Sequence, residues 1–360
     1  MAAGSFTASV ILEAQHRLDE MYASPNTAQP ELLAGEAAAA RALLPRQTAQ
    51  TLERTTGGYT VGAEVWFFRP GATDLDSGDW PADNDCDVPA GTEGETVKAD
   101  IATSILAYAT GKTRTNRSNN LITAEEEMAG TMAHICARLR RQLNRDVIIS
   151  GLEAVAQTNL DANINSAWDY TTNDPRIVVP EADFKWENLN EFRIVAKNNN
   201  FGDFFFLSGR LFNDNAWLAF LNRMNEGERQ AYLAWGQREI VFDERDLDSV
   251  LTRKSALAID VNSYAFWNMY RSGATPEVVE GTNYEIWKWA LPDPTGLVWN
   301  NNGRLTPVVY EFEMQMACTG RDAFDFHQAS RTMAGRLIGG FETVPEGPSG
   351  ETGTLLFAVS

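Results

Sequence analysis

The chain is poor in the residues from which most metal and redox sites are built. Its 360 residues include three cysteines and three histidines. They are Cys86, Cys136, Cys318, His16, His134 and His327. The cysteines lie far apart and form no C-x-x-C pair, so neither a disulfide framework nor a structural zinc site is expected. The histidines lie on separate segments, which argues against a histidine-dependent catalytic triad.

The chain also lacks a run of about 18 apolar residues, so no transmembrane helix is expected. Its first 24 residues lack the basic region of a signal peptide, and the short apolar run at residues 10–12 is soon followed by charged residues. We therefore expect a protein made in the cytoplasm that does not enter a membrane.

Basic residues are outnumbered, with 30 Lys and Arg against 49 Asp and Glu, for a formal net charge of −19. This balance disfavours binding to phosphate backbones, which needs clustered Lys and Arg. One basic cluster stands out, formed by Arg138, Arg140, Arg141 and Arg145. It could face nucleic acid, but a solvated face or ion pairs with acids of a neighbouring subunit are the favoured readings.

The common catalytic and ligand-binding motifs are missing. No G-x-S-x-G, H-E-x-x-H or G-x-G-x-x-G occurs. Gly111-Lys112-Thr113 resembles the end of a phosphate-binding loop, but Leu106 occupies the position that requires glycine. A possible calcium loop formed by Asp74, Asp76, Asp79 and Asp85 has aspartate where the motif needs glycine and glutamate. We predict no catalytic residues, no cofactor and no metal.

One alternative enzymatic interpretation rests on four carboxylates that are close in sequence: Asp243, Glu244, Asp246 and Asp248. Paired carboxylates are what a glycosidase needs, and aromatic side chains could stack on sugars. However, several tryptophans lie within apolar patterns typical of a core, namely Trp217, Trp235, Trp267, Trp287 and Trp289.

The strongest positive signal is a long amphipathic segment at residues 123–158. Its apolar residues recur in steps of three and four, from Met128 through Leu139 to Val155. Thr123 and Glu126 have the spacing of a capping box. At about 1.5 Å per residue, an unbroken helix here would be roughly 50 Å long. The alternative is a long helix of an ordinary domain, kinked at Gly151.

Segments before this helix favour arms over a globular domain. Residues 1–54 predict two helices, with Pro45 ending the second. Neither has a face large enough for an independent core, so we expect an N-terminal arm that packs on something else. Residues 60–68 predict a strand, residues 69–95 an acidic loop, and residues 96–115 an extended or hairpin-like return. We interpret 55–122 as a long two-stranded excursion.

Residues after the helix form a denser region. Strands are predicted at 177–179, 204–207, 256–260, 284–290, 308–318 and 355–359. Helices are predicted at 213–224, 226–235 and 262–271. Residues 186–305 thus predict a compact α/β or α+β unit. In 308–318, apolar and polar residues alternate, with Tyr310, Phe312 and Met314 on one face and Glu311 and Glu313 on the other.

This order of parts resembles the major capsid proteins of tailed phages, which have the Hong Kong 97 type fold. Local sequence is similar at Cys86-Asp87-Val88 followed by Gly91 and Glu93, at residues 204–209 (FFFLSG), and at Ile259-Asp260. The resemblance covers nearly the whole chain. It implies an α+β fold made of an N-terminal arm (1–57), an extended loop region (58–121), a peripheral domain with a long spine helix (122–185 and 306–360) and an axial domain (186–305).

The resemblance further implies a non-enzymatic shell protein that assembles into hexamers and pentamers of an icosahedral phage head. Its main partner would be itself, through the arm 1–57 and the extended loop 58–121, with portal, scaffold and decoration proteins as further candidates. Double-stranded DNA would be enclosed without sequence-specific binding, and the protein would reside in the virion after assembly in the host cytoplasm. Some relatives form covalent cross-links through a lysine, and Lys98 and Lys112 lie in the loop region, but no partner is identified. The alternatives are an acidic carbohydrate-active hydrolase and a nanocompartment shell of the same fold.

Overall fold

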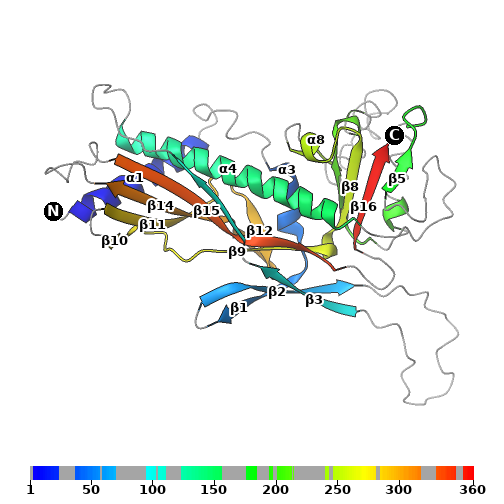
Figure 1. Ribbon diagram of the computed structural model, residues 1–360, viewed down its shortest axis with the longest axis horizontal. Helices are drawn as coiled ribbons and strands as arrows, with labels where there is room; N and C mark the ends of the chain where they lie inside the picture. Colours follow the sequence, from blue (N-terminus) through cyan, green and yellow to red (C-terminus); the bar gives the residue numbers. More distant parts are fainter. Residues whose placement is uncertain are drawn as a thin grey trace, which may run out of the picture. The chain divides into compact units, whose positions relative to one another are not determined.

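The computed structural model describes residues 3–23, 37–56, 59–69, 95–102, 104–110, 123–155, 176–184, 194–197, 201–212, 214, 240–242, 246–280, 284–317, 330–345 and 352–360 (Figure 1). The chain divides into two compact units. Unit 1 comprises Met1–Pro45, Ala102–Val147 and Phe266–Gly340. Unit 2 comprises Arg46–Ile101, Ile148–Ala265 and Phe341–Ser360. None of the described helices is both long and apolar enough to cross a membrane.

The predicted long helix is confirmed as α4 (Ala124–Glu153). Its capping box is present, because the Thr123 N–H donates to Glu126 Oε2 (3.0 Å) and the Glu126 N–H donates to Thr123 Oγ1 (3.2 Å). The predicted apolar face is buried at Met128, Met132, Ile135, Cys136, Leu139, Leu143 and Val147. The 3.6-residue periodicity therefore identified both the helix and its packed face.

Gly151 does not interrupt the helix, which continues to Glu153. A Cβ atom at Gly151 would lie 2.9 Å from Leu257 Cδ2 and 3.0 Å from Ile259 Cδ1, both in unit 2. The glycine thus permits close packing of the helix end on a strand.

Unit 1 is built on a sheet of order β10-β11-β14-β15-β4, in which β9 also pairs with β15. Its strands are β4 (Ser104–Ala109), β9 (Tyr264–Met269), β10 (Glu277–Glu280), β11 (Tyr284–Pro292), β14 (Val309–Ala317) and β15 (Ser330–Thr343). The path from β10 to β4 is antiparallel throughout. The predicted strands at 284–290 and 308–318 are therefore confirmed as β11 and β14.

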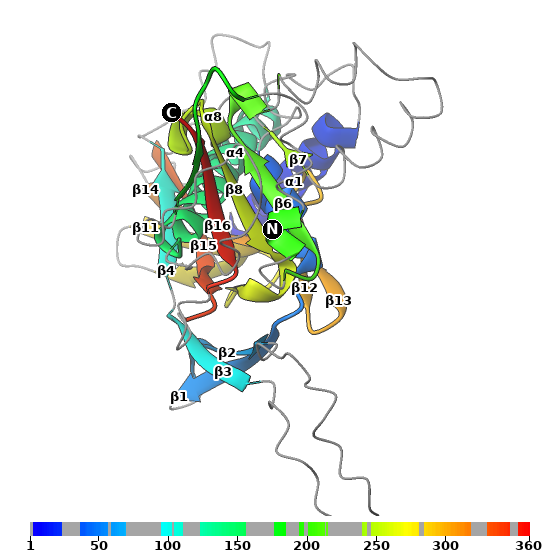
Figure 2. The same cartoon turned by 90° about the vertical axis from the view of Figure 1, so that its right-hand side faces the viewer.

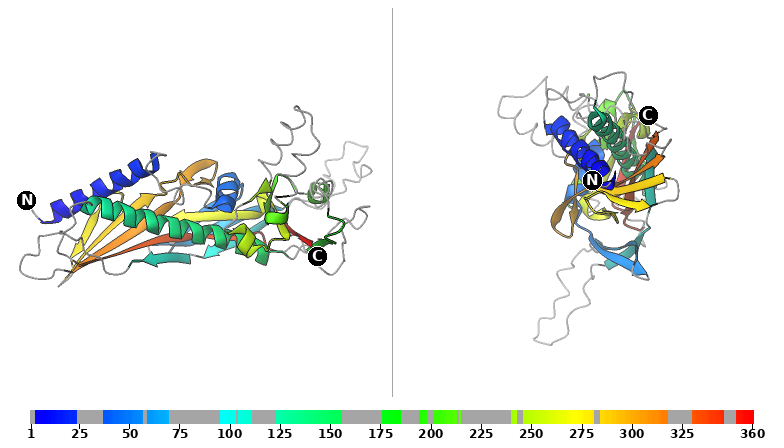
Figure 3. Two further views of the ribbon diagram at one scale, coloured as in Figure 1. Left: turned by 90° about the horizontal axis from the view of Figure 1, so that it is seen from above. Right: turned by 90° about the vertical axis from the view of Figure 1, so that its left-hand side faces the viewer.

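Helix α4 packs on one face of this sheet, as Figures 1 and 3 show. The face consists of the apolar side of β14, where Tyr310, Phe312, Met314 and Met316 are buried. Beside Phe312 in the register lies Gly335 of β15. A methyl group at Gly335 would overlap Ile135 Cγ2 of α4, so the glycine lets helix and strand approach directly.

The predicted aromatic helix at 262–271 is wrong. A single 3₁₀ turn, η3 (Val261–Ser263), is followed by strand β9, all six of whose residues are buried. A short apolar run buried on both faces has no periodicity that separates helix from strand. The side-chain amide of Asn268 ties β9 to its neighbours, donating to the carbonyls of Val309 (3.2 Å) and Ile338 (3.0 Å) and accepting from the Val309 N–H (2.8 Å). Pairing between distant segments decided the conformation here.

Two helices precede these elements, as predicted: α1 (Ala3–Ala23) and α3 (Ala38–Leu43), the latter followed by the 3₁₀ turn η1 (Leu44–Arg46). Both belong to unit 1. Ile11, Ala14 and Leu18 of α1 are fully buried, and the Ala40 N–H of α3 donates to Asn144 Oδ1 of α4 (3.1 Å). The helices of the predicted arm therefore pack within unit 1 of their own chain.

A two-stranded hairpin, β12 (Val298–Asn301) and β13 (Arg304–Pro307), was not predicted. It turns at Asn302 and Gly303, whose φ values of 51° and 87° are both left-handed, as a two-residue hairpin turn requires. The Gly303 N–H donates to Asn300 Oδ1 (2.8 Å).

Unit 2 contains a five-stranded sheet of order β5-β16-β8-β6-β7, visible in Figure 2. Its strands are β5 (Arg176–Val179), β6 (Phe204–Ser208), β7 (Ile240–Val241), β8 (Ser255–Asp260) and β16 (Thr354–Val359), and the short helix α8 (Leu247–Val250) also lies in this unit. Phe206 packs edge-to-face against Phe204 and Phe357, with ring centroids 5.2 and 6.0 Å apart. The strands predicted at 177–179, 204–207, 256–260 and 355–359 are confirmed.

Unit 2 also holds a three-stranded sheet, β1 (Gln50–Thr56), β2 (Tyr59–Arg69) and β3 (Glu95–Ala102), in that order. The predicted excursion at 55–122 is therefore divided. Its strands β2 and β3 are joined by β1 from the end of the predicted arm, whereas β4 pairs with β15 in the sheet of unit 1. The helices predicted at 213–224 and 226–235 lie outside the described residues, except for Asp214. The predicted unit 186–305 is divided between the two units: residues 186–265 belong to unit 2, and residues 266–305 belong to unit 1.

Candidate functional site

The carboxylates of the hydrolase interpretation are only partly described. Asp246 is buried and precedes α8, and Asp248 Oδ1 accepts a hydrogen bond from the Arg210 N–H (3.0 Å). Asp243 and Glu244 lie outside the described residues. Among the described tryptophans, those at positions 267, 287 and 289 are buried, as predicted for core residues.

The motif-like segments and most cysteines are not described. The candidate calcium aspartates, the segment 111–113, Cys86, Cys318 and His327 all lie outside the described residues. Cys136 is buried on α4, and burial raises the pKa of its thiol, so it is a packed thiol as predicted. Within the described ranges, no three Asp, Glu, His or Cys side chains are grouped as metal ligands.

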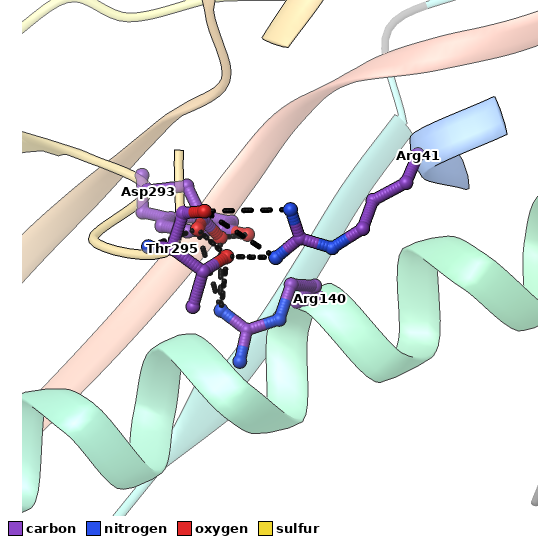
Figure 4. A network of polar contacts seen from close by, with 5 residues as sticks. Arg41, Arg140, Asp293 and Thr295 are labelled. Atoms are coloured by element: carbon purple, nitrogen blue, oxygen red, sulfur yellow. Dashed lines mark hydrogen bonds and ion pairs between the residues drawn. The ribbon is translucent and has the colours of Figure 1, made fainter. Parts of the chain in front are cut away.

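A connected polar group of unit 1 centres on Asp293 (Figure 4). Its carboxylate accepts from Arg140 Nη1 of α4 (3.1 and 3.3 Å) and from the Tyr310 hydroxyl of β14 (2.6 Å). Thr295 donates to it through its backbone N–H (2.7 Å) and its hydroxyl. Arg41 of α3 completes the group by donating to the Thr295 hydroxyl (2.6 Å). The Asp293 carboxylate therefore joins α4, β14 and the loop after β11, and Thr295 adds α3 to the group.

The electrostatics of this group fit a structural role. Burial by itself lowers the pKa of Arg140, but the negative charge of Asp293 more than compensates, so the pKa is raised and the guanidinium stays charged. Burial raises the pKa of Tyr310, so the hydroxyl keeps the proton that it donates to Asp293. Neither Arg140 nor Tyr310 is therefore poised to exchange a proton near neutral pH.

The location of Arg140 corrects the interpretation of the basic cluster. Arg140 is fully buried and paired within its own chain, and it faces neither solvent nor a neighbouring subunit. Arg138 is exposed, whereas Arg141 and Arg145 are half-buried. The apolar stem of Arg140 continues the buried face of α4, which the charge pattern alone did not reveal.

The three-stranded sheet of unit 2 has one buried and one exposed face. Ala63, Val65 and Phe67 of β2 are fully buried. On the opposite face, Leu52 is 62% exposed and Trp66 is 41% exposed. An exposed tryptophan beside an exposed leucine is the kind of apolar surface found at protein–protein contacts.

Two ion pairs cross the exposed face of this sheet. Lys98 Nζ lies 2.7 Å from Glu64 Oε1 and 5.9 Å from the centre of the Trp66 ring. Arg54 of β1 lies 2.8 Å from Asp100 of β3. This second pair spans β2 at Gly62, which is opposite Arg54 in the register and has no side chain to block it. Lys98 is thus engaged in an ion pair, and Lys112 is not described.

Comparisons with known proteins gave structural matches only. No protein-family model matches the chain, and no curated protein matches it. It is similar to a solved structure from Microbacterium phage Oxtober96 (9% identity, TM-score 0.43, 91% of this chain and 92% of that chain). It is also similar to the capsid of cyanophage P-SCSP1u (10% identity, TM-score 0.40, 88% of this chain and 87% of that chain). A third similar structure is the capsid of Ralstonia phage GP4 (9% identity, TM-score 0.38, 83% of this chain and 82% of that chain). The similar structures are those of bacteriophages, and two of them are described as capsids.

Proposed function

We propose that the chain is the structural shell protein of a phage head, which assembles with copies of itself into hexamers and pentamers around double-stranded DNA. It has no catalytic role in this proposal. The observation that carries the proposal is the packing of the 30-residue helix α4 against the 14-residue strand β15 at Gly335. The resemblance implies a peripheral domain with a long spine helix, and this packing of a long helix on a long strand supports that assignment.

The two units suggest a refined assignment of the predicted domains. Unit 1, with the α4–β15 packing, would hold the peripheral domain, and it would include residues 266–305. The five-stranded sheet of unit 2 would form the axial domain. The three-stranded sheet would be the extended loop region, joined by β1 from the predicted arm.

Contacts between subunits would involve the exposed face of the three-stranded sheet. Leu52 and Trp66 offer apolar area there, while the Lys98–Glu64 and Arg54–Asp100 pairs limit nonspecific association. Portal, scaffold and decoration proteins remain further candidate partners. The net charge of −19 suits a shell that encloses DNA without binding its backbone tightly.

The test is the mass of the purified protein by light scattering, with negative-stain images of the same sample. We expect closed particles or rings of five or six subunits. A monomer near 39.8 kDa under several salt conditions would contradict the proposal.

The contents of the particles separate the related alternatives. Nucleic acid inside particles from infected or induced cells supports a phage head, whereas a protein cargo would indicate a nanocompartment shell of the same fold. A monomer that hydrolyses glycans, and loses this activity in Asp243→Asn or Glu244→Gln, would instead establish the hydrolase.

A further inference from the structure

The two edges of the unit 1 sheet differ in chemistry. At one edge, β10 has four residues, of which Glu277 and Glu280 are charged. At the other edge, β4 reads Ser-Ile-Leu-Ala-Tyr-Ala and has neither a charge nor a proline. Charged residues, prolines and short strands are the usual protection of an edge against pairing with another chain. Among the described strands, β4 pairs only with β15, so its outer edge lacks that protection.

The side chains of β4 point alternately toward and away from α4. Tyr108 lies on the α4 side, where its hydroxyl is 3.3 Å from His134 Nε2 and the two rings meet edge-to-face. Ile105, Ala107 and Ala109 lie on the other face and are exposed, Ile105 by 59%. The register with β15 fixes this alternation, because Tyr108 pairs with Gly335, whose missing side chain is on the α4 side.

We infer that the outer edge of β4 pairs antiparallel with β4 of a second copy of this chain, about a two-fold axis at Ala107. The inference rests on the proposed function only in that assembly brings a second copy to this edge. In this register Ile105 lies opposite Ala109 of the second copy and Leu106 lies opposite Tyr108. Each exposed large side chain then meets a small one, and the half-buried pair joins an aliphatic to an aromatic side chain.

Self-pairing is favoured over other occupants by the absence of charge. In an isologous contact residue i meets residue j of the second copy and j meets i, so a charged residue near the axis would lie close to its own copy. The six uncharged residues of β4 avoid this in a chain that otherwise carries 79 charged residues (30 basic, 49 acidic). β10 could not pair with itself in this way, because its glutamates would be close to each other.

Cysteine cross-linking tests the contact and its register. Two directly opposite residues of antiparallel strands have Cα atoms about 4.5–5.5 Å apart, within the range of a disulfide. We expect Ala107→Cys particles to give a disulfide-linked dimer under mild oxidation. Ile105→Cys is the matched control, because its two copies would be four residues out of register, about 13 Å apart, and should not cross-link. Wild-type protein controls for the natural cysteines.

Charge swapping tests whether position 107 meets itself. Ala107→Asp and Ala107→Lys should each lose most of their particles, whereas a mixture of the two should recover them. Ala107→Ser should assemble like the wild type. Because residue 107 is exposed within its own chain, none of these variants should change the urea midpoint of the dissociated subunit.

The outcomes separate this inference from the proposed function. Wild-type particles with no Ala107→Cys dimer would overturn the β4 contact and leave the shell role intact. The β4 contact would also be overturned if the Ala107→Cys thiol did not cross-link in particles and yet was protected there from thiol reagents. Another segment or partner would then cover the edge. A cross-linked dimer that never forms particles would support the contact and contradict the shell role.

Discussion

Two arginine–aspartate ion pairs of similar length have very different surroundings in this protein. In unit 1, Arg140 and Asp293 are 3.1 Å apart, and their side chains are 1% and 0% exposed. In unit 2, Arg54 and Asp100 are 2.8 Å apart, and their side chains are 48% and 54% exposed. Removing one member of a buried pair leaves an uncompensated charge out of water, whereas water replaces the partner at the surface. Burial, and not the distance between the charges, therefore decides what each pair contributes.

The largest effect is expected for Asp293→Ala. This change leaves the Arg140 guanidinium buried without its counter-ion, and we expect a loss of about 3–5 kcal/mol in the free energy of unfolding. Urea denaturation of the dissociated subunit measures it. The double variant Arg140→Met/Asp293→Leu should recover only part of the loss. It removes both charges and keeps apolar volume, but it leaves the Tyr310 hydroxyl and the Thr295 N–H without their acceptor. An Asp293→Ala protein as stable as the wild type would mean that Arg140 reaches solvent.

The free energy of unfolding should respond almost as strongly to a change in the packing of α4 on β15. Gly335→Ala places a methyl group against Ile135 of α4, and we expect it to cost about 1–3 kcal/mol through overpacking. Gly130→Ala is the matched control on the exposed side of the same helix. No atom lies within 4 Å of its new Cβ, so the better helix former should stabilise the protein by about 0.5–1 kcal/mol. If both variants had the same sign of effect, the α4–β15 packing would be misplaced.

The ion pair of a third carboxylate, Glu311 of β14, is intermediate in exposure between the buried Arg140–Asp293 pair and the exposed Arg54–Asp100 pair. Glu311 is 1% exposed and its partner Arg336 is 35% exposed. Burial by itself raises its pKa, but the backbone N–H groups of Arg271 and Ser272 and the guanidinium of Arg336 more than compensate, so the pKa lies below its ordinary value of 4.5. A depressed pKa means that the carboxylate stabilises the fold above pH 4.5 and that this contribution is lost as the pH falls through the folded-state pKa.

The pH dependence of Glu311→Gln should reveal this contribution. The difference in urea midpoint between wild type and Glu311→Gln should be largest near neutral pH and should shrink as the pH drops below 4.5. A difference that stays constant from neutral pH down to about pH 3 would show that the ionised form of Glu311 has no special role.

The smallest effect is expected at the surface pair. Arg54→Ala should change the free energy of unfolding by no more than about 1 kcal/mol, and raising the salt concentration should reduce even that. Thermal denaturation at low and high salt checks both parts. A loss as large as that of Asp293→Ala would show that the pair is buried in the state measured.

Local sequence patterns were sufficient for the elements that bury one face. The steps of three and four in α4, its Thr123–Glu126 cap and the alternation of β14 are each written in neighbouring residues, because side-chain direction follows directly from helix or strand geometry. The same is true of the core strands β6 and β8, whose length and composition rule out an exposed segment.

Elements that depend on distant partners were beyond those patterns. Strand β9 was predicted as a helix because a short, mostly apolar run fits either state, and only pairing with β15 and the Asn268 bridge selected the strand. Strand β1 was not predicted and was included in the helical arm, because its place in a sheet comes from its register with β2. The helices of that arm were predicted correctly, but their burial in unit 1 was not.

For the candidate sites, the sequence by itself determined which chemical groups are present: few histidines and cysteines, and more acidic than basic residues. It also determined the long amphipathic helix and indicated the extended excursion before it. Only the tertiary structure decided that Arg140 is an internal counter-ion of Asp293, 153 residues away, and that β4 is an uncharged sheet edge. The physical reason is that charge and hydrophobicity belong to single residues, whereas burial and pairing belong to contacts between segments that the chain brings together only when it folds.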